Sequence, residues 1–219
     1  MRKRRSHLRS TKPAEPLYYD VGDRLRLIPF RARGLSRSDR LELIIDSGPA
    51  FGIGDHPTTV VALALLEVAV ARLLSQQGPP MLLDVGTGTG VLAIAGKALG
   101  AGFTVALDTD FTAVACAKRN VCLNPFGEET VERSRAHLFI GGVDAVVGEF
   151  DLVVANLVAP ELLRLHEHLA SRVGKLLILS GIADPMMDDV VGTYGSDRLR
   201  VVTSKRESGW NAVLFERGR

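Results

Sequence analysis

The hydrophobic positions of this chain fall into short apolar runs that alternate with longer segments of helical character. Short runs that are apolar almost throughout, such as 151–155, are typical of parallel strands covered by helices on both faces. The segments of this kind predict strands at 81–85, 103–107, 151–155 and 175–179, and helices at 57–74, 91–99, 111–123, 160–173 and 185–194. Such alternation of strands and helices predicts a doubly wound α/β sheet.

The two ends of the chain depart from this alternation. Residues 198–204 and 210–216 predict two strands with no helix between them, hence a hairpin and one antiparallel strand. Near the start, charged and apolar residues alternate over 23–30, and a second apolar run covers 41–45. We therefore expect three parts: a basic arm at 1–20, a linker-like β-appendage at 21–48, and a main domain at 49–219.

Composition narrows the class of protein. The chain has 219 residues, of which 46% are hydrophobic and 24% charged, which excludes wholesale disorder. The apolar stretch 58–74 is interrupted by Glu67 and Arg72 and is shorter than the roughly 20 residues that a membrane span needs, so no span is predicted. Cys116 and Cys122 lie in one predicted helix without facing each other, which indicates reduced thiols in a cytoplasmic protein.

Charge is distributed unevenly. The formal net charge is +2, yet residues 1–12 carry six positive charges and no acid, so the remainder sums to −4. A basic arm of this kind fits contact with nucleic acid or an acidic surface. It fits equally well a solubilising terminus without a partner.

A glycine-rich turn stands between the first strand and the first helix of the alternating region. It reads Asp84-Val-Gly-Thr-Gly-Thr-Gly90, and its glycines let a ligand lie against the backbone. A dinucleotide-binding loop would carry another glycine at position 91, which is Val91 here. The loop therefore favours S-adenosylmethionine over NAD. The amino-acid part of S-adenosylmethionine carries no pyrophosphate that needs the helix N-terminus.

An acidic residue follows at the spacing that a ribose contact requires. Asp108 ends the next strand, 18 residues after Gly90. A carboxylate at this place accepts both hydroxyl groups of an adenosine ribose. Asp110 is the competing candidate, and its position also suits the N-cap of the helix that begins at 111.

Several motifs together resemble one family, the PrmA methyltransferases of ribosomal protein L-eleven. Residues 50–59, AFGIGDHPTT, resemble its AFGTGTHPTT signature, and 45–50, IDSGPA, resemble its lead-in. The loop at 84–90 corresponds to its DxGCGSG, Asn156-Leu-Val-Ala159 to its NILA, and Ser180-Gly-Ile to its SGI. The resemblance runs from about Val21 to the C-terminus. It implies a class I, Rossmann-like sheet of seven strands that binds S-adenosylmethionine and methylates amino groups.

Carried over by position, the resemblance implies a set of cofactor contacts and a set of catalytic residues. The cofactor contacts would be Phe51, Thr59, Gly86, Gly88, Asp108 and Asn156, and the catalytic residues Asn156, His56 and Asp55. Asn156 would accept a hydrogen bond from the acceptor N–H and aim its lone pair at the methyl group. His56 suits either a substrate contact or a structural role at a helix start. No metal ligands are implied.

Two departures bear on the acceptor. Asp55 replaces a family threonine and adds a charge beside the pocket, while Thr87 replaces the loop cysteine. Longer family members carry an N-terminal substrate-recognition domain, whereas only about 20 residues precede Val21 here. We therefore expect a protein or small-molecule amine as acceptor, and poor transfer to the ribosomal protein.

Three other functions remain open. A nucleic-acid methyltransferase is disfavoured because the segment from Asn156 lacks an aromatic residue that would stack on a flipped base. A nicotinamide-dependent oxidoreductase is disfavoured by Val91, and a non-catalytic cofactor-binding relative is the third alternative. His166 and His168 lie two apart on a predicted helix and diverge, so they indicate surface residues rather than a metal site. Trp210 suits either core packing or pocket lining.

Overall fold

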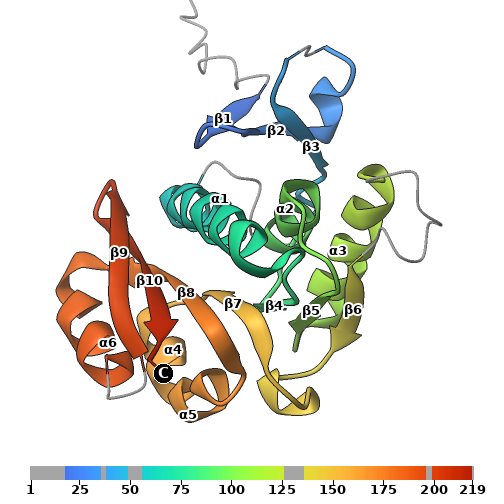
Figure 1. The fold of residues 1–219 in the computed structure, drawn as a ribbon. Helices are drawn as coiled ribbons and strands as arrows, with labels where there is room; N and C mark the ends of the chain where they lie inside the picture. Colours follow the sequence, from blue (N-terminus) through green and yellow to red (C-terminus); the bar gives the residue numbers. More distant parts are fainter. Residues whose placement is uncertain (1–17, 36–37, 49–55, 126–135, 196–198, 219) are drawn as a thin grey trace, which may run out of the picture.

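The computed structural model describes residues 18–35, 38–48, 56–125, 136–195 and 199–218. Within these residues the strands form a seven-stranded sheet and a separate three-stranded sheet (Figure 1). The large sheet consists of β4 (Leu82–Val85), β5 (Thr104–Asp108), β6 (His137–Ile140), β7 (Phe150–Asn156), β8 (Val173–Ala183), β9 (Leu199–Glu207) and β10 (Trp210–Arg217).

The order of the large sheet is β6-β5-β4-β7-β8-β10-β9. The pairs among β4 to β8 are parallel, and β10 is antiparallel to both β8 and β9. This arrangement confirms the predicted doubly wound α/β sheet with an antiparallel strand at the C-terminal end of the chain. The β9–β10 hairpin turns at Ser208 and Gly209, both of which have positive φ.

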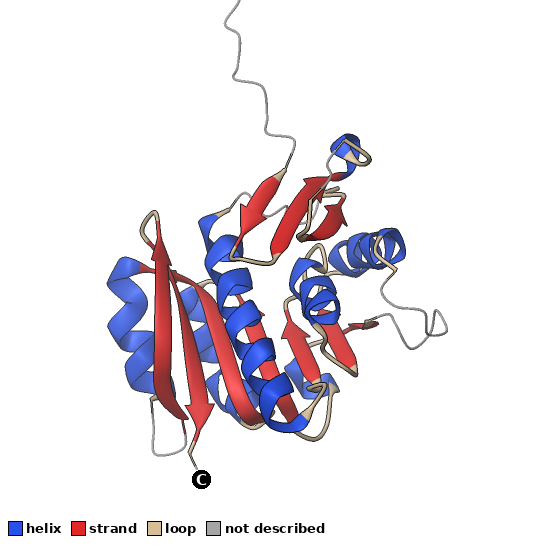
Figure 2. Ribbon diagram, turned by 45° about the horizontal axis from the view of Figure 1, so that its top comes forward, coloured by secondary structure: helices blue, strands red, loops and turns tan. Residues whose placement is uncertain are grey.

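Helices cover both faces of this sheet (Figure 2). One face packs against α1 (Pro57–Gln77), α2 (Val91–Leu99) and α3 (Phe111–Leu123). The other packs against α4 (Ala159–Arg164), α5 (His166–Ala170) and α6 (Met187–Tyr194). Alternate strand residues join different cores: Leu152 and Val154 face the first group of helices, and Val153 and Ala155 face the second. Coverage of both faces explains why the strands are apolar almost throughout.

The small sheet comprises β1 (Tyr19–Val21), β2 (Leu25–Pro29) and β3 (Leu41–Ile45), followed after β2 by a 3₁₀ turn, Phe30–Ala32. β1 and β2 are antiparallel, and β2 and β3 are parallel. Its inner side chains, among them Leu25, Leu27, Leu43 and Ile45, belong to the same hydrophobic core as α1 and α2. The predicted β-appendage therefore exists, and it shares its core with the main sheet.

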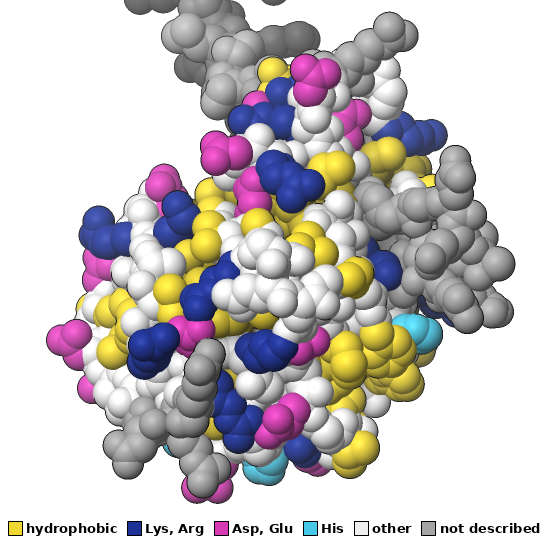
Figure 3. All heavy atoms as spheres, viewed as in Figure 1, with side chains coloured by type: hydrophobic (Ala, Val, Ile, Leu, Met, Phe, Trp, Pro, Cys, Tyr) yellow, Lys and Arg dark blue, Asp and Glu magenta, His cyan; other side chains and the backbone are white. Residues whose placement is uncertain are grey.

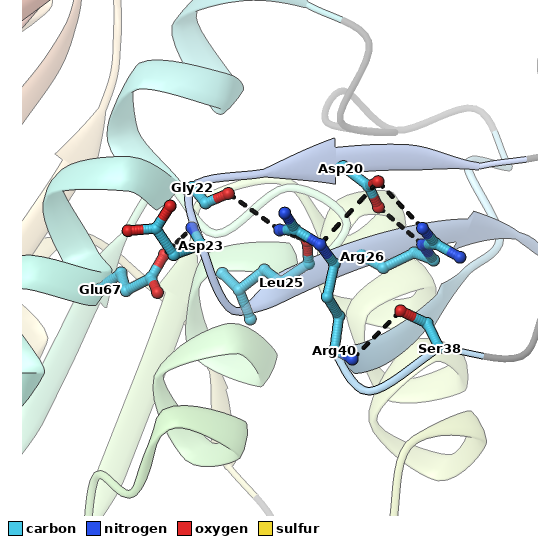
Figure 4. A network of polar contacts seen from close by, with 8 residues as sticks. All are labelled: Asp20, Gly22, Asp23, Leu25, Arg26, Ser38, Arg40 and Glu67. Atoms are coloured by element: carbon cyan, nitrogen blue, oxygen red, sulfur yellow. Dashed lines mark hydrogen bonds and ion pairs between the residues drawn. The ribbon is translucent and has the colours of Figure 1, made fainter.

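Polar contacts fasten the β1–β2 turn to α1 (Figure 4). The Asp23 N–H donates to Glu67 Oε2 at 3.1 Å, and the Arg40 guanidinium donates to the Gly22 carbonyl at 2.8 Å. On the outer face, Arg26 binds Asp20 through two hydrogen bonds of 2.6 and 2.9 Å. Glu67, which interrupts the apolar pattern of α1, thus holds the small sheet.

The structure corrects three expectations. β6 was not predicted, because it is a short edge strand with largely exposed side chains and therefore has no buried face to produce a pattern. The helix expected at 160–173 is two short helices, interrupted at Leu165, whose φ of −91° and ψ of 6° leave the helical region.

The third correction concerns α1. It runs to Gln77 and, by length and composition alone, is long and apolar enough to cross a membrane, contrary to the expectation from 58–74. However, 56% of its most apolar window is buried inside the protein, against the sheet and α2. That burial is the behaviour of a core helix.

Candidate functional site

A cavity of about 750 Å³ lies at the carboxyl ends of the central parallel strands. The loop after β4, the end of β5 and the end of β7 form its walls, together with the start of α1. Strand order reverses here, since β5 lies on one side of β4 and β7 on the other. Open α/β sheets bind their ligands at such a switch point.

The glycine loop forms the floor of the cavity. Gly86, Gly88 and Gly90 have φ of 73°, 56° and 82°, a region that side chains disfavour. The N–H groups of Gly86 and Thr87 both donate to the Leu107 carbonyl at 2.9 Å, which ties the loop to β5. The loop is therefore a fixed backbone surface.

Asp84 supports the loop from beneath. It is fully buried, and its Oδ2 accepts from the Thr87 hydroxyl at 2.6 Å and from the Ala93 N–H at 3.2 Å. Its Oδ1 has no hydrogen-bond partner within the described chain. Desolvation by burial raises the pKa of Asp84 to about 7, although both hydrogen bonds lower it.

Asp108 and Asp110 have separate roles. Asp108 Oδ2 accepts from the Gly88 N–H and Oδ1 from the Asp110 N–H, each at 3.0 Å. These two bonds orient the carboxylate beside the cavity, and each oxygen keeps a further lone pair for a ligand hydroxyl. Asp110 instead caps α3 by accepting from the Thr112 N–H at 2.7 Å, so the N-cap alternative for it is confirmed.

Asn156 ends β7 opposite Ser180 of β8 and lines the cavity. Its side-chain amide makes no hydrogen bond with any residue that the structure describes. The following residue is held through the Leu157 N–H, which donates to the Ser180 carbonyl at 3.1 Å. Gly181, with φ of 88°, passes so close that a Cβ would lie 2.2 Å from the Leu157 carbonyl oxygen. Only glycine therefore fits at this point of the cavity wall.

The start of α1 forms the opposite wall. His56 is the N-cap of α1, and its Nδ1 accepts from the Thr58 N–H at 3.3 Å. The His56 ring meets the Trp210 ring edge-on, with 5.4 Å between centroids. Both rings line the cavity, which is the second of the two roles considered for Trp210. Thr59 is fully buried, and its Oγ1 has no hydrogen-bond partner in the described part of the chain.

Two groups of cavity residues escaped the sequence analysis. The turn after β6, Gly141 to Asp144, lines the cavity, and it was missed because β6 itself was not predicted. Glu161 and Arg164 of α4 stand at the rim and form an exposed i,i+3 ion pair of 2.5 Å. The only feature of the sequence that could have indicated Glu161 and Arg164 is their position shortly after the Asn156 motif.

The predicted site residues within the described chain come together. His56, Thr59, Gly86, Gly88, Asp108 and Asn156 all line this one cavity. Phe51 and Asp55 lie outside the described residues. The His166 ring lies edge-on to the Tyr194 ring at 4.8 Å, while His168 is exposed. The described residues contain no group of three or more His, Cys, Asp or Glu side chains that could hold a metal ion.

The family profile described as ribosomal protein L11 methyltransferase (PrmA) matches residues 12–218. The chain belongs to this family. A curated relative from Pelobacter propionicus, named ribosomal protein L11 methyltransferase, is 37% identical over 202 residues, which is 90% of this chain and 62% of the relative. One of the same name from Myxococcus xanthus is 38% identical over 177 residues, 81% of this chain and 58% of the relative. The chain thus spans about three fifths of the length of these PrmA relatives.

Solved structures support the fold. A ribosomal protein L11 methylase from Lactobacillus delbrueckii subsp. bulgaricus superposes with a TM-score of 0.77 at 27% identity, covering 92% of this chain and 99% of that one. Magnesium protoporphyrin IX methyltransferase from Synechocystis, solved with bound S-adenosylmethionine, has a TM-score of 0.58 at 18% identity and covers 74% of this chain and 82% of its own. The latter similarity concerns the fold alone. This PrmA chain therefore has the class I methyltransferase fold.

Proposed function

We propose that this chain is an S-adenosylmethionine-dependent N-methyltransferase that acts on amino groups. One observation carries the proposal: the glycine loop, Asp108 and Asn156, which are far apart in the sequence, line a single cavity at the switch point of the sheet. Membership of the PrmA family gives independent support. Cys116 and Cys122 form no disulfide, which supports a cytoplasmic location for the reaction.

The residues present fit S-adenosylmethionine as cofactor. The Asp108 carboxylate is oriented to accept ribose hydroxyl groups, and the backbone of Gly86 and Gly88 offers a surface without side chains. The buried Oγ1 of Thr59 has no partner among the residues that the structure describes, and such atoms usually bond to a ligand or water. When bound, this cofactor supplies an electrophilic methyl group on a sulfonium centre.

The chain's own residues would position the acceptor rather than activate it. Because the lone pair of the amine attacks, the acceptor nitrogen must be neutral and in line with the transferred methyl group. The side-chain amide of Asn156, which makes no hydrogen bond to a described residue, suits this task, since its oxygen can accept from an acceptor N–H. The described residues that line the cavity include four acids, Asp108, Asp110, Asp144 and Glu161, and one cation, Arg164, which pairs with Glu161. This excess of negative charge favours a cationic amine on approach. The roles proposed for Phe51, Asp55 and His56 rest on the family resemblance alone.

Cofactor binding is tested by calorimetry with S-adenosylhomocysteine, and with NAD as the competing ligand. We expect the unmodified chain to bind the former only. Asp108→Ala should weaken binding at least tenfold, because charge-assisted hydrogen bonds contribute roughly 1.5–3 kcal/mol each. Asp110→Ala is the matched control, since it removes the neighbouring carboxylate and a helix cap worth about 1 kcal/mol of stability. Equal affinity of the two variants would refute the ribose contact.

The acceptor is tested by transfer of a labelled methyl group. The names of the relatives point to ribosomal protein L11, and the alternatives are another protein, a small amine or a nucleic acid. Basic and acidic side chains are interspersed over the face in Figure 3, without a basic stripe on that face. The segment from Asn156 has no aromatic residue to stack on a flipped base, which favours a protein or small amine over nucleic acid. We expect labelled amines in protein or small-molecule fractions, and little label in RNA.

In the same assay, Asn156→Ala should lower turnover more than it lowers affinity for S-adenosylhomocysteine. Efficient labelling of ribosomal protein L11 by this chain alone would contradict our expectation that transfer to it is poor. If the chain binds the cofactor but labels none of these fractions, it is a non-catalytic relative.

A further inference from the structure

β3 is an edge strand of the small sheet, because it pairs with β2 on one side only. Its free edge faces α3, whose side chains Asn120 and Asn124 are buried, with 0% and 6% of their surface exposed. Buried amides of this kind need partners for all of their donors and acceptors. Those partners are the backbone groups of β3 and of the residue that follows it.

Each amide pairs with the backbone as a neighbouring strand would. Asn124 Oδ1 accepts from the Ile44 N–H at 2.8 Å, and its Nδ2 donates to the Ile44 carbonyl at 2.7 Å. Asn120 Oδ1 accepts from the Asp46 N–H at 2.8 Å, and its Nδ2 donates to the Asp46 carbonyl at 2.9 Å.

The spacing of the two pairs matches. Four helical residues rise about 6 Å and two strand residues about 6.6 Å, so positions 120 and 124 of α3 fall opposite positions 46 and 44. Up to this point Asn120 and Asn124 are equivalent, and both protect the edge of β3.

Asn120 differs from Asn124 in its remaining contact. The second N–H of Asn120 donates to the Thr89 carbonyl, inside the glycine loop, at 2.9 Å. The second N–H of Asn124 donates to the Asn120 carbonyl, one turn back in the same helix, at 2.8 Å. Ala117, one turn before Asn120, also meets the loop: a Cβ on Gly90 would lie 3.1 Å from its Cβ.

A short chain of contacts then leads to the cofactor site. Thr89 follows Gly88, whose N–H donates to Asp108 Oδ2 at 3.0 Å. A single buried amide therefore joins three segments: the end of β3, helix α3 and the part of the loop that orients Asp108. The residues it bridges are 74 and 31 positions away in sequence.

We propose that Asn120 is a positioning residue for the cofactor site, which fixes the glycine loop against the small N-terminal sheet and so makes cofactor affinity depend on that sheet. The inference rests on the proposed function, because it assigns to Asn120 an effect on cofactor binding. Asn124 holds the same strand without touching the loop, so it has no such effect.

The experiment compares Asn120→Asp with Asn124→Asp. Each substitution keeps an acceptor for the strand N–H and removes two donors, so both should lower stability. Only Asn120→Asp removes the hydrogen bond from position 120 to the Thr89 carbonyl and places an oxygen against that carbonyl. We expect it to weaken S-adenosylhomocysteine binding about tenfold by calorimetry, and Asn124→Asp less than threefold. If either variant fails to fold, the neutral pair Asn120→Ser and Asn124→Ser replaces both.

A second readout needs no ligand. The Gly90 N–H is bonded to the Thr87 carbonyl at 2.8 Å and reports opening of the loop by hydrogen exchange. Its exchange should accelerate at least tenfold in Asn120→Asp and stay within threefold of the unmodified chain in Asn124→Asp.

Equal effects of the two substitutions, on affinity and on exchange, would overturn the inference alone. Failure of the unmodified chain to bind S-adenosylhomocysteine would overturn the proposed function, and the role of Asn120 in cofactor binding with it.

Discussion

The Asp84 carboxyl group is fully buried near the end of β4, beneath the glycine loop. Two hydrogen bonds converge on its Oδ2, while Oδ1 has none within the described chain. Burial disfavours the charged form and raises the pKa of Asp84 to about 7. The nearby Asp108 carboxylate adds to this increase. The group that supports the loop is thus neutral over much of the acidic range.

This residue predicts a pH-dependent stability. The folded-state pKa lies above the ordinary value of 3.8, so the contribution of Asp84 is complete below about pH 4, declines as the pH rises to about 7 and is constant above that. At about 1.4 kcal/mol per pKa unit, the decline amounts to roughly 4 kcal/mol at most. Urea unfolding of the unmodified chain and of Asp84→Asn from pH 4 to pH 8 should show that the stability of the unmodified chain falls relative to that of the variant as the pH rises.

If the difference in unfolding free energy between the two proteins does not change with pH, the pKa of Asp84 is not raised by burial. Other acids work in the opposite direction and at lower pH. The Arg206 guanidinium holds the pKa of Asp184 at about 2, so its contribution is lost only as the pH falls below its ordinary range. Comparison of the two proteins at each pH removes such contributions because they are common to both.

At the scale of elements, the small sheet and helices α1 to α3 act as one packed unit. Leu43 and Leu27 belong to the hydrophobic core that includes α1 and α2. Glu67 of α1 accepts a hydrogen bond from the β1–β2 turn. Asn120 and Asn124 of α3 form hydrogen bonds with the backbone of β3 and the residue after it. The apolar inner face of this small sheet is buried against the helices rather than in a core of its own. We therefore infer that it folds with the main domain.

Leu43→Ala tests this inference, because Leu43 is fully buried between the small sheet and the helices. The change should lower the free energy of unfolding by about 2–5 kcal/mol. Fluorescence and far-UV circular dichroism should still report a single coincident transition. Leu35→Ala is the control, since Leu35 is 68% exposed and its truncation should cost less than about 0.5 kcal/mol. A separate early transition for Leu43→Ala would mean that the small sheet unfolds independently.

At the scale of the whole molecule, strand order assembles the site. β4 and β7 are neighbours in the sheet although 64 residues lie between the end of β4 at Val85 and the start of β7 at Phe150, a stretch that contains α2, β5, α3 and β6. This pairing puts Asn156 beside the loop that contains Gly86, and it puts Asp108 on the other side. The antiparallel β10 then brings Trp210 to the same cavity, against His56. Residues from His56 to Trp210 thus converge on one edge of the sheet.

Local sequence was sufficient to predict features that depend on residues close together in the chain, such as the starts of helices. Pro57, Val91 and Phe111 begin the helices predicted to start at those positions, because a proline, a glycine turn or an acidic cap sets each start locally. Motif positions also placed Gly86 and Asp108 at the ends of strands. Where burial decides, the sequence was insufficient: β6 has no buried face to mark it, and the break at Leu165 has no proline or glycine.

The sequence by itself determined the alternation of strands and helices, the glycine loop, the acid after it and the family, since each depends on residue types at short spacings. Only the tertiary structure decided which strands are neighbours, that Asp110 caps α3 while Asp108 is held by the glycine loop, and that Asn120 joins Asp46 to Thr89. The physical reason is the same in each case. Hydrogen bonds and burial between distant segments depend on how the whole chain packs, and no local pattern carries that information.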